Sequence, residues 1–245
     1  MVTGASSGIG AAVARALLQR GVTVVGVDLR PDRMKEWQLN DFTGQLYPLY
    51  GDVSDEESIL SVFKWITDTL GGVDILVNCA GLCRNCSLIS APTSDWKLML
   101  DVNLLGLSIC TREAVQDMFK RGVDDGFIVH ICSIAGHVPI HDAEYSMYYA
   151  SKVAVKTLLE GLRKDLVARK SNIRVGFSMI SVLLWAADVT AVDAAAEMLR
   201  PRFRNRQDAE SNTGNVASCN HARHRRRQAK PSATPLIPAG GTPRS

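Results

Sequence analysis

The chain has 245 residues, of which 46% are hydrophobic and 22% are charged, a composition that excludes a disordered or fibrous protein and favours a globular one with a substantial core. The formal net charge of +3 is unevenly distributed, because residues 201–245 hold nine Lys and Arg against two Asp and Glu. The uncharged stretch at residues 175–187 has 13 residues, short of the roughly 20 apolar residues that cross a bilayer, so we expect no membrane span.

Short apolar segments alternate with helical patterns along residues 1–175. Apolar residues recur at helical spacing in residues 12–17 and 153–162. This alternation predicts an α/β fold, a doubly wound parallel sheet with helices on both faces, in three layers. The expected strands are Val22–Val27, Asp74–Val77, Phe127–Cys132 and Asn172–Val175.

A glycine-rich segment, Thr3-Gly4-Ala5-Ser6-Ser7-Gly8-Ile9-Gly10, stands directly before the first helical pattern. Glycines let the chain turn sharply and let backbone N–H groups approach a pyrophosphate, while the helix N-terminus adds partial positive charge. Only Met1 and Val2 precede this loop, so we expect a truncated first strand. The predicted cofactor-binding residues of the loop are Gly4, Ser6, Ser7, Gly8, Ile9 and Gly10.

The choice of nicotinamide cofactor depends on the end of the second strand. Asp28 follows Val27 there, about 20 residues beyond the glycine loop. A carboxylate in this position accepts hydrogen bonds from the adenosine ribose hydroxyls and repels a 2′-phosphate, which favours NAD. Arg30, two residues on, could pair with that phosphate, so NADP stays as the alternative.

Tyr148 and Lys152 are candidate catalytic residues, because a spacing of four places both side chains on one face of a helix. A phenol with a pKa near 10 is a poor base at neutral pH, and a nearby cation such as Lys152 would stabilise its phenolate. Ser133 follows an apolar strand 15 residues before Tyr148, and its hydroxyl could orient a substrate oxygen. Tyr145 and Tyr149 are rival tyrosines without the four-residue offset.

The loop spacing T-G-x-x-x-G-x-G, followed by Asn78-Cys79-Ala80-Gly81, Ser133 and the Tyr148/Lys152 pair, resembles the classical short-chain dehydrogenase/reductase family. The resemblance implies a Rossmann-like fold and further site residues. Asp52 and Val53 would contact the adenine edge, and Ala80 and Gly81 would let the cofactor lie against the backbone. Asn78 would pin neighbouring strands. Asn103 matches a helix asparagine that holds a water for proton relay.

The resemblance also implies the reaction: Tyr148 exchanges a proton with the substrate hydroxyl, a hydride passes to or from nicotinamide, and no metal takes part. The substrate would be a small alcohol or ketone. The loop near His137 is similar to the insect farnesol-dehydrogenase-like and ketosteroid-reducing branch. A homo-oligomer is implied through helices that include the one bearing Tyr148. Unpaired cysteines and the absence of a secretory signal pattern predict a cytoplasmic protein.

After residue 175 the chain departs from the family pattern, since no Pro-Gly turn follows and a basic, Pro- and Ser-rich stretch replaces the expected strands. We therefore expect a dinucleotide-binding catalytic domain at 1–175, an atypical apolar or helical segment at 176–200 and a disordered basic tail at 201–245. The C-terminal strands of the fold would be missing. This leaves a second hypothesis, a catalytically impaired member that only binds nucleotides or partners.

Two weaker patterns stay open. The Cys83-Arg84-Asn85-Cys86 segment has redox-pair spacing but lacks the strand-to-helix context of such pairs. The cluster Arg223 and Arg225–Arg227 could contact nucleic-acid phosphates, but it has no interleaved aromatic residues. We expect no nucleic-acid partner.

Overall fold

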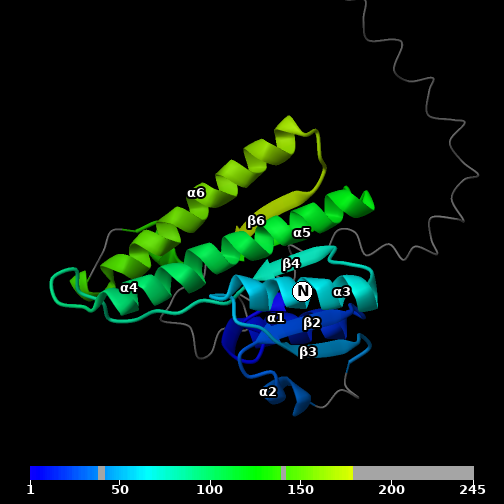
Figure 1. Ribbon diagram of the computed structural model, residues 1–245, viewed down its shortest axis with the longest axis horizontal. Coiled ribbons are helices and arrows are strands. Elements are labelled where there is room, and N and C mark those ends of the chain that lie inside the picture. Colours follow the sequence, from blue (N-terminus) through cyan, green and yellow to red (C-terminus); the bar gives the residue numbers. More distant parts are fainter. Residues whose placement is uncertain (38–41, 139–141, 179–245) are drawn as a thin grey trace, which may run out of the picture. The chain divides into compact units, whose positions relative to one another are not determined.

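The computed structural model describes residues 1–37, 42–138 and 142–178. Within them lies one six-stranded sheet in the order β3-β2-β1-β4-β5-β6, and every neighbouring pair is parallel (Figure 1). The strands are β1 (Val2–Thr3), β2 (Val24–Asp28), β3 (Leu46–Tyr50), β4 (Ile75–Asn78), β5 (Phe127–Ile131) and β6 (Arg174–Ser178). The predicted α/β class and parallel sheet are confirmed.

Helices connect consecutive strands. They are α1 (Gly8–Gln19), α2 (Asp32–Lys35), α3 (Glu56–Leu70), α4 (Thr93–Leu100), α5 (Leu107–Arg121) and α6 (Ser146–Ala168), with a π-helix η2 (Asp101–Gly106) and two 3₁₀ turns, η3 (Ile134–Gly136) and η4 (Ala143–Tyr145). Local signals set several ends: the Asp55 carboxylate caps α3 by accepting from the N–H of Glu57 at 3.1 Å. Helices α3 and α5 both stop at a left-handed glycine, Gly71 and Gly122.

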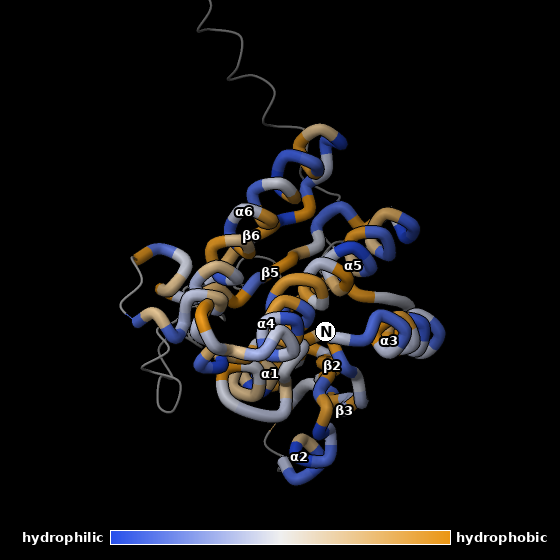
Figure 2. Tube along the Cα trace, turned by 60° about the vertical axis from the view of Figure 1, so that its left-hand side comes forward, coloured by the Kyte–Doolittle hydropathy of each residue, from blue (hydrophilic) through white to orange (hydrophobic). Residues whose placement is uncertain are grey.

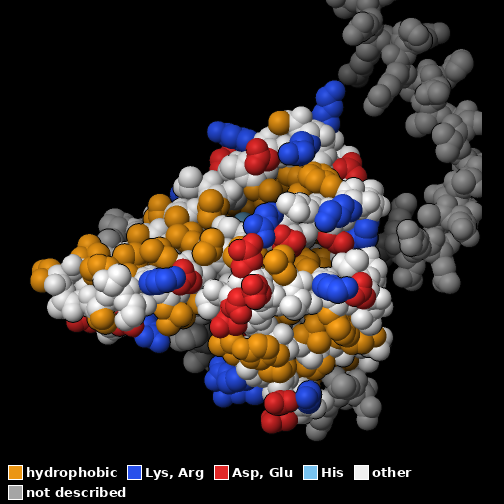
Figure 3. All heavy atoms as spheres, viewed as in Figure 1, with side chains coloured by type: hydrophobic (Ala, Val, Ile, Leu, Met, Phe, Trp, Pro, Cys, Tyr) orange, Lys and Arg blue, Asp and Glu red, His pale blue; other side chains and the backbone are white. Residues whose placement is uncertain are grey.

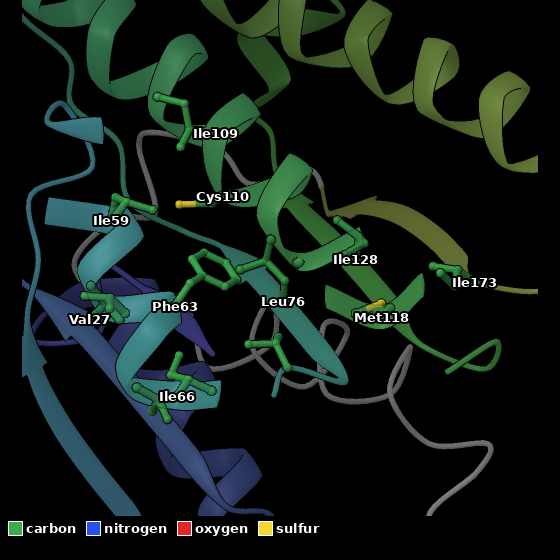
Figure 4. Close-up of a cluster of buried hydrophobic side chains, with 14 of the residues drawn as sticks. Val27, Ile59, Phe63, Ile66, Leu76, Ile109, Cys110, Met118, Ile128 and Ile173 are labelled. Carbon is green, nitrogen blue, oxygen red and sulfur yellow. The ribbon is translucent and has the colours of Figure 1, made fainter. Parts of the chain in front are cut away.

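Each face of the sheet has its own hydrophobic core. Helix α1 packs Leu17 and Leu18 against one face, together with Val77 and Val129. On the other face α3 and α5 contribute Ile59, Phe63 and Met118, which pack with Leu76 and Ile128 (Figure 4). Consecutive strand residues therefore point into opposite cores, and Figure 2 shows β2 and β5 as largely hydrophobic runs. This arrangement makes the three layers that the alternating pattern predicted.

Strands β1 and β6 are the first and the last strand of the described chain. Strand β1 has only two residues and lies between β2 and β4, and the Met1 carbonyl extends the ladder by accepting from Val77 N–H at 2.9 Å. Strand β6 continues to Ser178, three residues beyond the strand end expected at Val175, because it pairs with β5 along its whole length. The expected segments after residue 178, the missing C-terminal strands and the Arg223–Arg227 cluster lie outside the described residues.

Within the described part of the chain, no helix combines the length and apolar composition required to cross a bilayer.

Candidate active site

A groove of about 570 Å³ opens at the carboxyl ends of the central strands. Its walls come from the loops that follow β1, β2, β3 and β4, with one residue of η2. In open parallel sheets, ligands bind at this edge where the strand order reverses, here between β1 and β4. The lining residues are Gly4, Ser7, Ile9, Gly10, Val27, Asp28, Leu29, Arg30, Gly51, Asp52, Val53, Cys79, Ala80, Gly81, Leu82 and Val102.

The glycine loop forms the floor of this groove. Gly4 has φ +66°, and a Cβ there would lie 2.9 Å from the Ala80 Cα, while a Cβ at Gly10 would collide with the Gly4 carbonyl oxygen. Helix α1 starts at Gly8 without a side-chain cap or an acidic first turn, so its free N–H groups and positive end remain available to an anion. The buried Ser6 hydroxyl has no partner among the described residues. These features fit a dinucleotide pyrophosphate.

Two carboxylates, Asp28 and Asp52, line the groove where β2 and β3 end. The Asp28 carboxylate accepts from the backbone N–H of Ser6 at 3.1 Å and from that of Arg30 at 3.0 Å, so it braces the glycine loop. Each oxygen retains a lone pair for a further donor. The Asp52 carboxylate accepts from the backbone N–H and the hydroxyl of Ser54, and both Asp52 and Val53 line the groove.

The segment after β4 is held from both sides. The Thr3 hydroxyl accepts from the N–H groups of Cys79 and Ala80, both at 3.0 Å, and thereby sets Ala80 against Gly4. Asn78 is buried beneath the groove and does not line it. Its amide donates to the Thr111 hydroxyl of α5 at 3.0 Å, so it joins β4 to a helix and reaches the neighbouring β5 only through Thr111.

Asn103 lies in the π-helix η2 rather than in a regular α-helix. Its Oδ1 accepts from Leu82 N–H at 2.9 Å, and its Nδ2 donates to the Leu82 carbonyl at 2.9 Å and to the Ser151 hydroxyl at 3.2 Å. The amide thus clamps the groove wall to α6. Single π-turns of this kind are frequent at functional sites, because they re-aim a side chain.

The predicted catalytic side chains meet beside this clamp. Ser133 and Tyr148 are buried, and the Ser133 hydroxyl caps η3 by accepting from Ala135 N–H at 3.2 Å. The Lys152 ammonium lies 5.7 Å from the centre of the Tyr148 ring and donates to the Ile131 carbonyl at 3.2 Å. A Cβ on Gly81 would lie 3.6 Å from that ammonium nitrogen, so Lys152 reaches the groove wall.

The electrostatics differ from the expectation that Lys152 lowers the pKa of the phenol. Burial raises the pKa of Tyr148 above its usual value, and a hydrogen bond with Ser133 only partly opposes this. Burial also lowers the pKa of Lys152, an effect opposed by the thiols of Cys132, Cys79 and Cys83. Both side chains are removed from water, which disfavours the charged phenolate and the charged ammonium alike. The ammonium, in addition, is bound to the Ile131 carbonyl.

Several residues of the site carried no usable sequence signal. Thr3, Leu82 and Ser151 act through hydrogen bonds to residues more than 20 positions away, except for the short bond from Ser151 to Tyr148. Gly106 ends η2 where any Cβ would collide with the Val53 carbonyl, so it permits the close approach of η2 to the groove. The only indication in the sequence is that Thr3 and Ser151 stand inside motifs.

Comparison with known proteins is consistent with this geometry. Residues 1–196 match the family model described as short chain dehydrogenase. The chain is 49% identical over 178 residues to dehydrogenase/reductase SDR family member 11 of Bos taurus, covering 71% of this chain and 70% of that protein. It is 41% identical over 179 residues to farnesol dehydrogenase of Aedes aegypti, covering 71% and 73%.

Among solved structures, a metagenomic short-chain oxidoreductase in complex with NADP is similar, with a TM-score of 0.72 and 27% identity. That similarity covers 81% of this chain and 87% of the other. The likeness of the chain to the family and to its farnesol-dehydrogenase branch, which the motifs indicated, is therefore confirmed.

The buried polar network under the groove predicts a pH-dependent stability. The Thr111 hydroxyl donates to the Leu107 carbonyl, so His130 Nε2, 3.1 Å from that hydroxyl, is the donor. Burial, and secondly the charge of Lys152, lowers the pKa of His130 to about 4. Stability from the neutral imidazole is complete above pH 6.5 and is lost as the pH falls toward 4.

Between pH 7 and pH 5 we expect His130 to cost up to about 2 kcal/mol of unfolding free energy. Urea denaturation at the two pH values measures this loss. The His130→Gln variant has no titrating group at this position and should lose correspondingly less. An equal loss in both proteins would contradict the prediction.

Proposed function

The chain belongs to the short-chain dehydrogenase family, and we propose that it transfers a hydride between a nicotinamide cofactor and an alcohol or ketone, with Tyr148 as the acid/base. One observation carries the proposal: the Lys152 ammonium, the Tyr148 ring and the Gly81 wall of the dinucleotide groove lie together. Nicotinamide supplies or accepts the hydride when bound.

The side chains divide the work on the substrate oxygen. Ser133 lowers the pKa of the Tyr148 phenol, against the effect of burial, and can also polarise the substrate oxygen. In oxidation Tyr148 accepts the hydroxyl proton as the carbonyl forms, and in reduction it donates a proton to the new alkoxide oxygen. When the Lys152 ammonium moves from the Ile131 carbonyl toward the Tyr148 ring, it lowers the free energy needed to form the phenolate.

The role of Asn103 follows from its occupied amide. Both Nδ2 hydrogens have protein acceptors, the Leu82 carbonyl and the Ser151 hydroxyl. A relay water could bind only the remaining lone pair of Oδ1 or the backbone carbonyls of η2. We infer that Asn103 acts first as a clamp and serves proton relay through the shape it gives η2.

The substrate we propose is an uncharged, apolar alcohol or ketone. The cluster around Tyr148 is largely apolar and includes Leu82, Cys83, Trp96 and Met147, with the Trp96 Nε1 as a buried donor that has no described partner. At its edge the charges are already paired, since Arg84 contacts Asp95 at 2.6 Å. Arg84 is thus already neutralised by a carboxylate, and the Lys152 ammonium beside Tyr148 is bound to the Ile131 carbonyl. One relative is named for an apolar alcohol, farnesol.

Replacing Tyr148 by Phe tests the acid/base role. We expect kcat to fall by on the order of 10²- to 10⁴-fold, because proton transfer from a positioned acid is lost while the ring remains. Turnover of apolar alcohols and ketones, followed by nicotinamide absorbance, is the measurement. The matched control is Tyr149→Phe, which should keep its activity. Full activity of Tyr148→Phe would remove Tyr148 from this role, and turnover of hydroxy acids alone would contradict the substrate class.

We further propose NAD as the preferred cofactor. The Asp28 carboxylate is fixed at the groove by two backbone donors, which suits ribose hydroxyls and opposes a 2′-phosphate. Arg30 lines the same groove, and a related structure holds NADP, so NADP use is the competing outcome.

The Asp28→Asn variant removes the charge and keeps an acceptor for the glycine loop. We expect the ratio of NADPH to NADH affinity to rise about tenfold or more, because the repulsion of the 2′-phosphate disappears. Fluorescence titration of each reduced cofactor measures the ratio. Asp32→Asn, an exposed acid paired with Lys35, is the control and should leave it unchanged. Tighter binding of NADPH than NADH to the unaltered protein would overturn the preference.

A homo-oligomer is proposed through α5 and α6. A second groove of about 570 Å³ lies between these helices, and Figure 3 shows hydrophobic side chains gathered there. Phe119 and Leu158 line it with 38% and 42% of their surface exposed. A second copy of the chain would cover this apolar strip.

Sedimentation velocity tests this assembly. We expect the unaltered protein to sediment as a dimer or larger, and Leu158→Glu to shift it toward the monomer, because a charge would be buried. Leu88→Glu, at an exposed leucine outside the groove, serves as the control. A monomer at every concentration of the unaltered protein would refute the proposal.

The compartment is inferred from the thiols. The five cysteines in the described part of the chain are all unpaired. Three of these cysteines raise the pKa of Lys152. Unpaired cysteines suit a reducing compartment such as the cytoplasm.

A further inference from the structure

Ser151 stands between Tyr148 and Lys152 in α6 and has no part in the reaction proposed above. Its side chain is 0% exposed. The hydroxyl donates to the Tyr148 carbonyl at 2.7 Å and accepts from Asn103 Nδ2 at 3.2 Å. Ser151 therefore joins the backbone of the proposed acid/base residue to the clamp in η2.

The hydrogen bonds continue from this hydroxyl to the cofactor groove. The Asn103 amide binds both the N–H and the carbonyl of Leu82, and Leu82 lines the groove. Neighbouring Gly81 lies against Asn103 Oδ1, where a Cβ would come to 3.3 Å. One continuous hydrogen-bonded chain thus leads from the Tyr148 carbonyl to the wall of the groove.

A serine at this helix position requires an explanation. Alanine is the better helix former, and a hydroxyl that bonds back to a carbonyl in its own helix does not stabilise the helix. Asn103 is only 1% exposed, however, and without Ser151 one of its amide hydrogens would have no described partner. A buried unpaired N–H is costly, so the hydroxyl's value lies in its bond to Asn103.

We propose that Ser151 is a positioning residue that couples the cofactor groove to Tyr148 through Asn103 and Leu82. The proposal deepens the function given above and rests on it. Ser151 touches neither substrate nor cofactor. It acts by holding the first turns of α6 and the loop after β4 in one register, so that Tyr148 and Lys152 stay aligned with the groove.

The test replaces Ser151 by Ala in the full chain. We expect kcat/KM for an apolar alcohol to fall about tenfold, as one buried hydrogen bond is lost. The pH profile of kcat/KM should shift to higher pH, because a less well aligned Lys152 stabilises the phenolate less. NADH should bind several-fold more weakly by fluorescence titration, because the Leu82 wall is released. All rates are expressed per cofactor-binding site, so that misfolded protein does not count.

Two variants complete the design. Ser151→Thr keeps the hydroxyl and should restore most of the kcat/KM, the pH profile and the NADH affinity. Ser61→Ala removes a comparable helix serine, whose hydroxyl donates to the Glu57 carbonyl at 2.9 Å on the exposed face of α3, and should change nothing. The inference is overturned if Ser151→Ala matches Ser61→Ala in all three readouts, or if Ser151→Thr is no better than Ser151→Ala.

The two levels of the proposal fail differently. If the unaltered protein binds NADH but turns over no alcohol or ketone, the proposed reaction fails, and the NADH affinities of the three variants still decide the coupling. If the unaltered protein is active and Ser151→Ala is equally active, the reaction stands and only the role of Ser151 is lost.

Discussion

The close approach of two backbone segments, the glycine loop after β1 and the Cys79–Gly81 segment after β4, is the constraint on which the site depends. A Cβ on Gly4 would lie 2.9 Å from the Ala80 Cα, so no other residue fits without displacing one of the segments. Thr3 enforces the contact by accepting two N–H groups from the facing segment. Because β1 and β4 are neighbours at the point where the strand order reverses, this contact forms the floor of the groove.

A second set of constraints sits behind that floor, where water is largely excluded. Asn103 joins the groove wall to α6, and Ser133 caps the turn that packs against the same helix. Gly136 permits that packing, since a Cβ there would lie 2.9 Å from the Lys152 carbonyl. Burial raises the pKa of Tyr148 and lowers that of Lys152. The site without ligands therefore disfavours charge on both Tyr148 and Lys152. In the proposed reaction, the substrate and the cofactor would complete the site.

The same dry environment explains why two unpartnered atoms occur beneath the groove. His130 and Asn78 are opposite each other on β5 and β4, and both use their only described partner, the Thr111 hydroxyl. A single hydroxyl can accept from both, but it leaves His130 Nδ1 and Asn78 Oδ1 without a described partner. The network links two strands to α5 and makes the neutral imidazole a condition of stability.

The residue pattern alone was sufficient to predict the parallel α/β sheet, and it singled out the glycine loop and the Tyr148/Lys152 pair as candidates, because these depend on periodicity and on spacings within a few positions. It could not predict that Asn103 lies in a π-helix, that the Lys152 ammonium binds the Ile131 carbonyl, or that β6 runs on to Ser178. Those features arise from partners 21 to 48 positions distant in the chain, such as Leu82 and Ser151 for Asn103. The sequence determines which chemical groups are present, whereas burial and long-range hydrogen bonds, which exist only in the folded chain, decide their orientation and their charge.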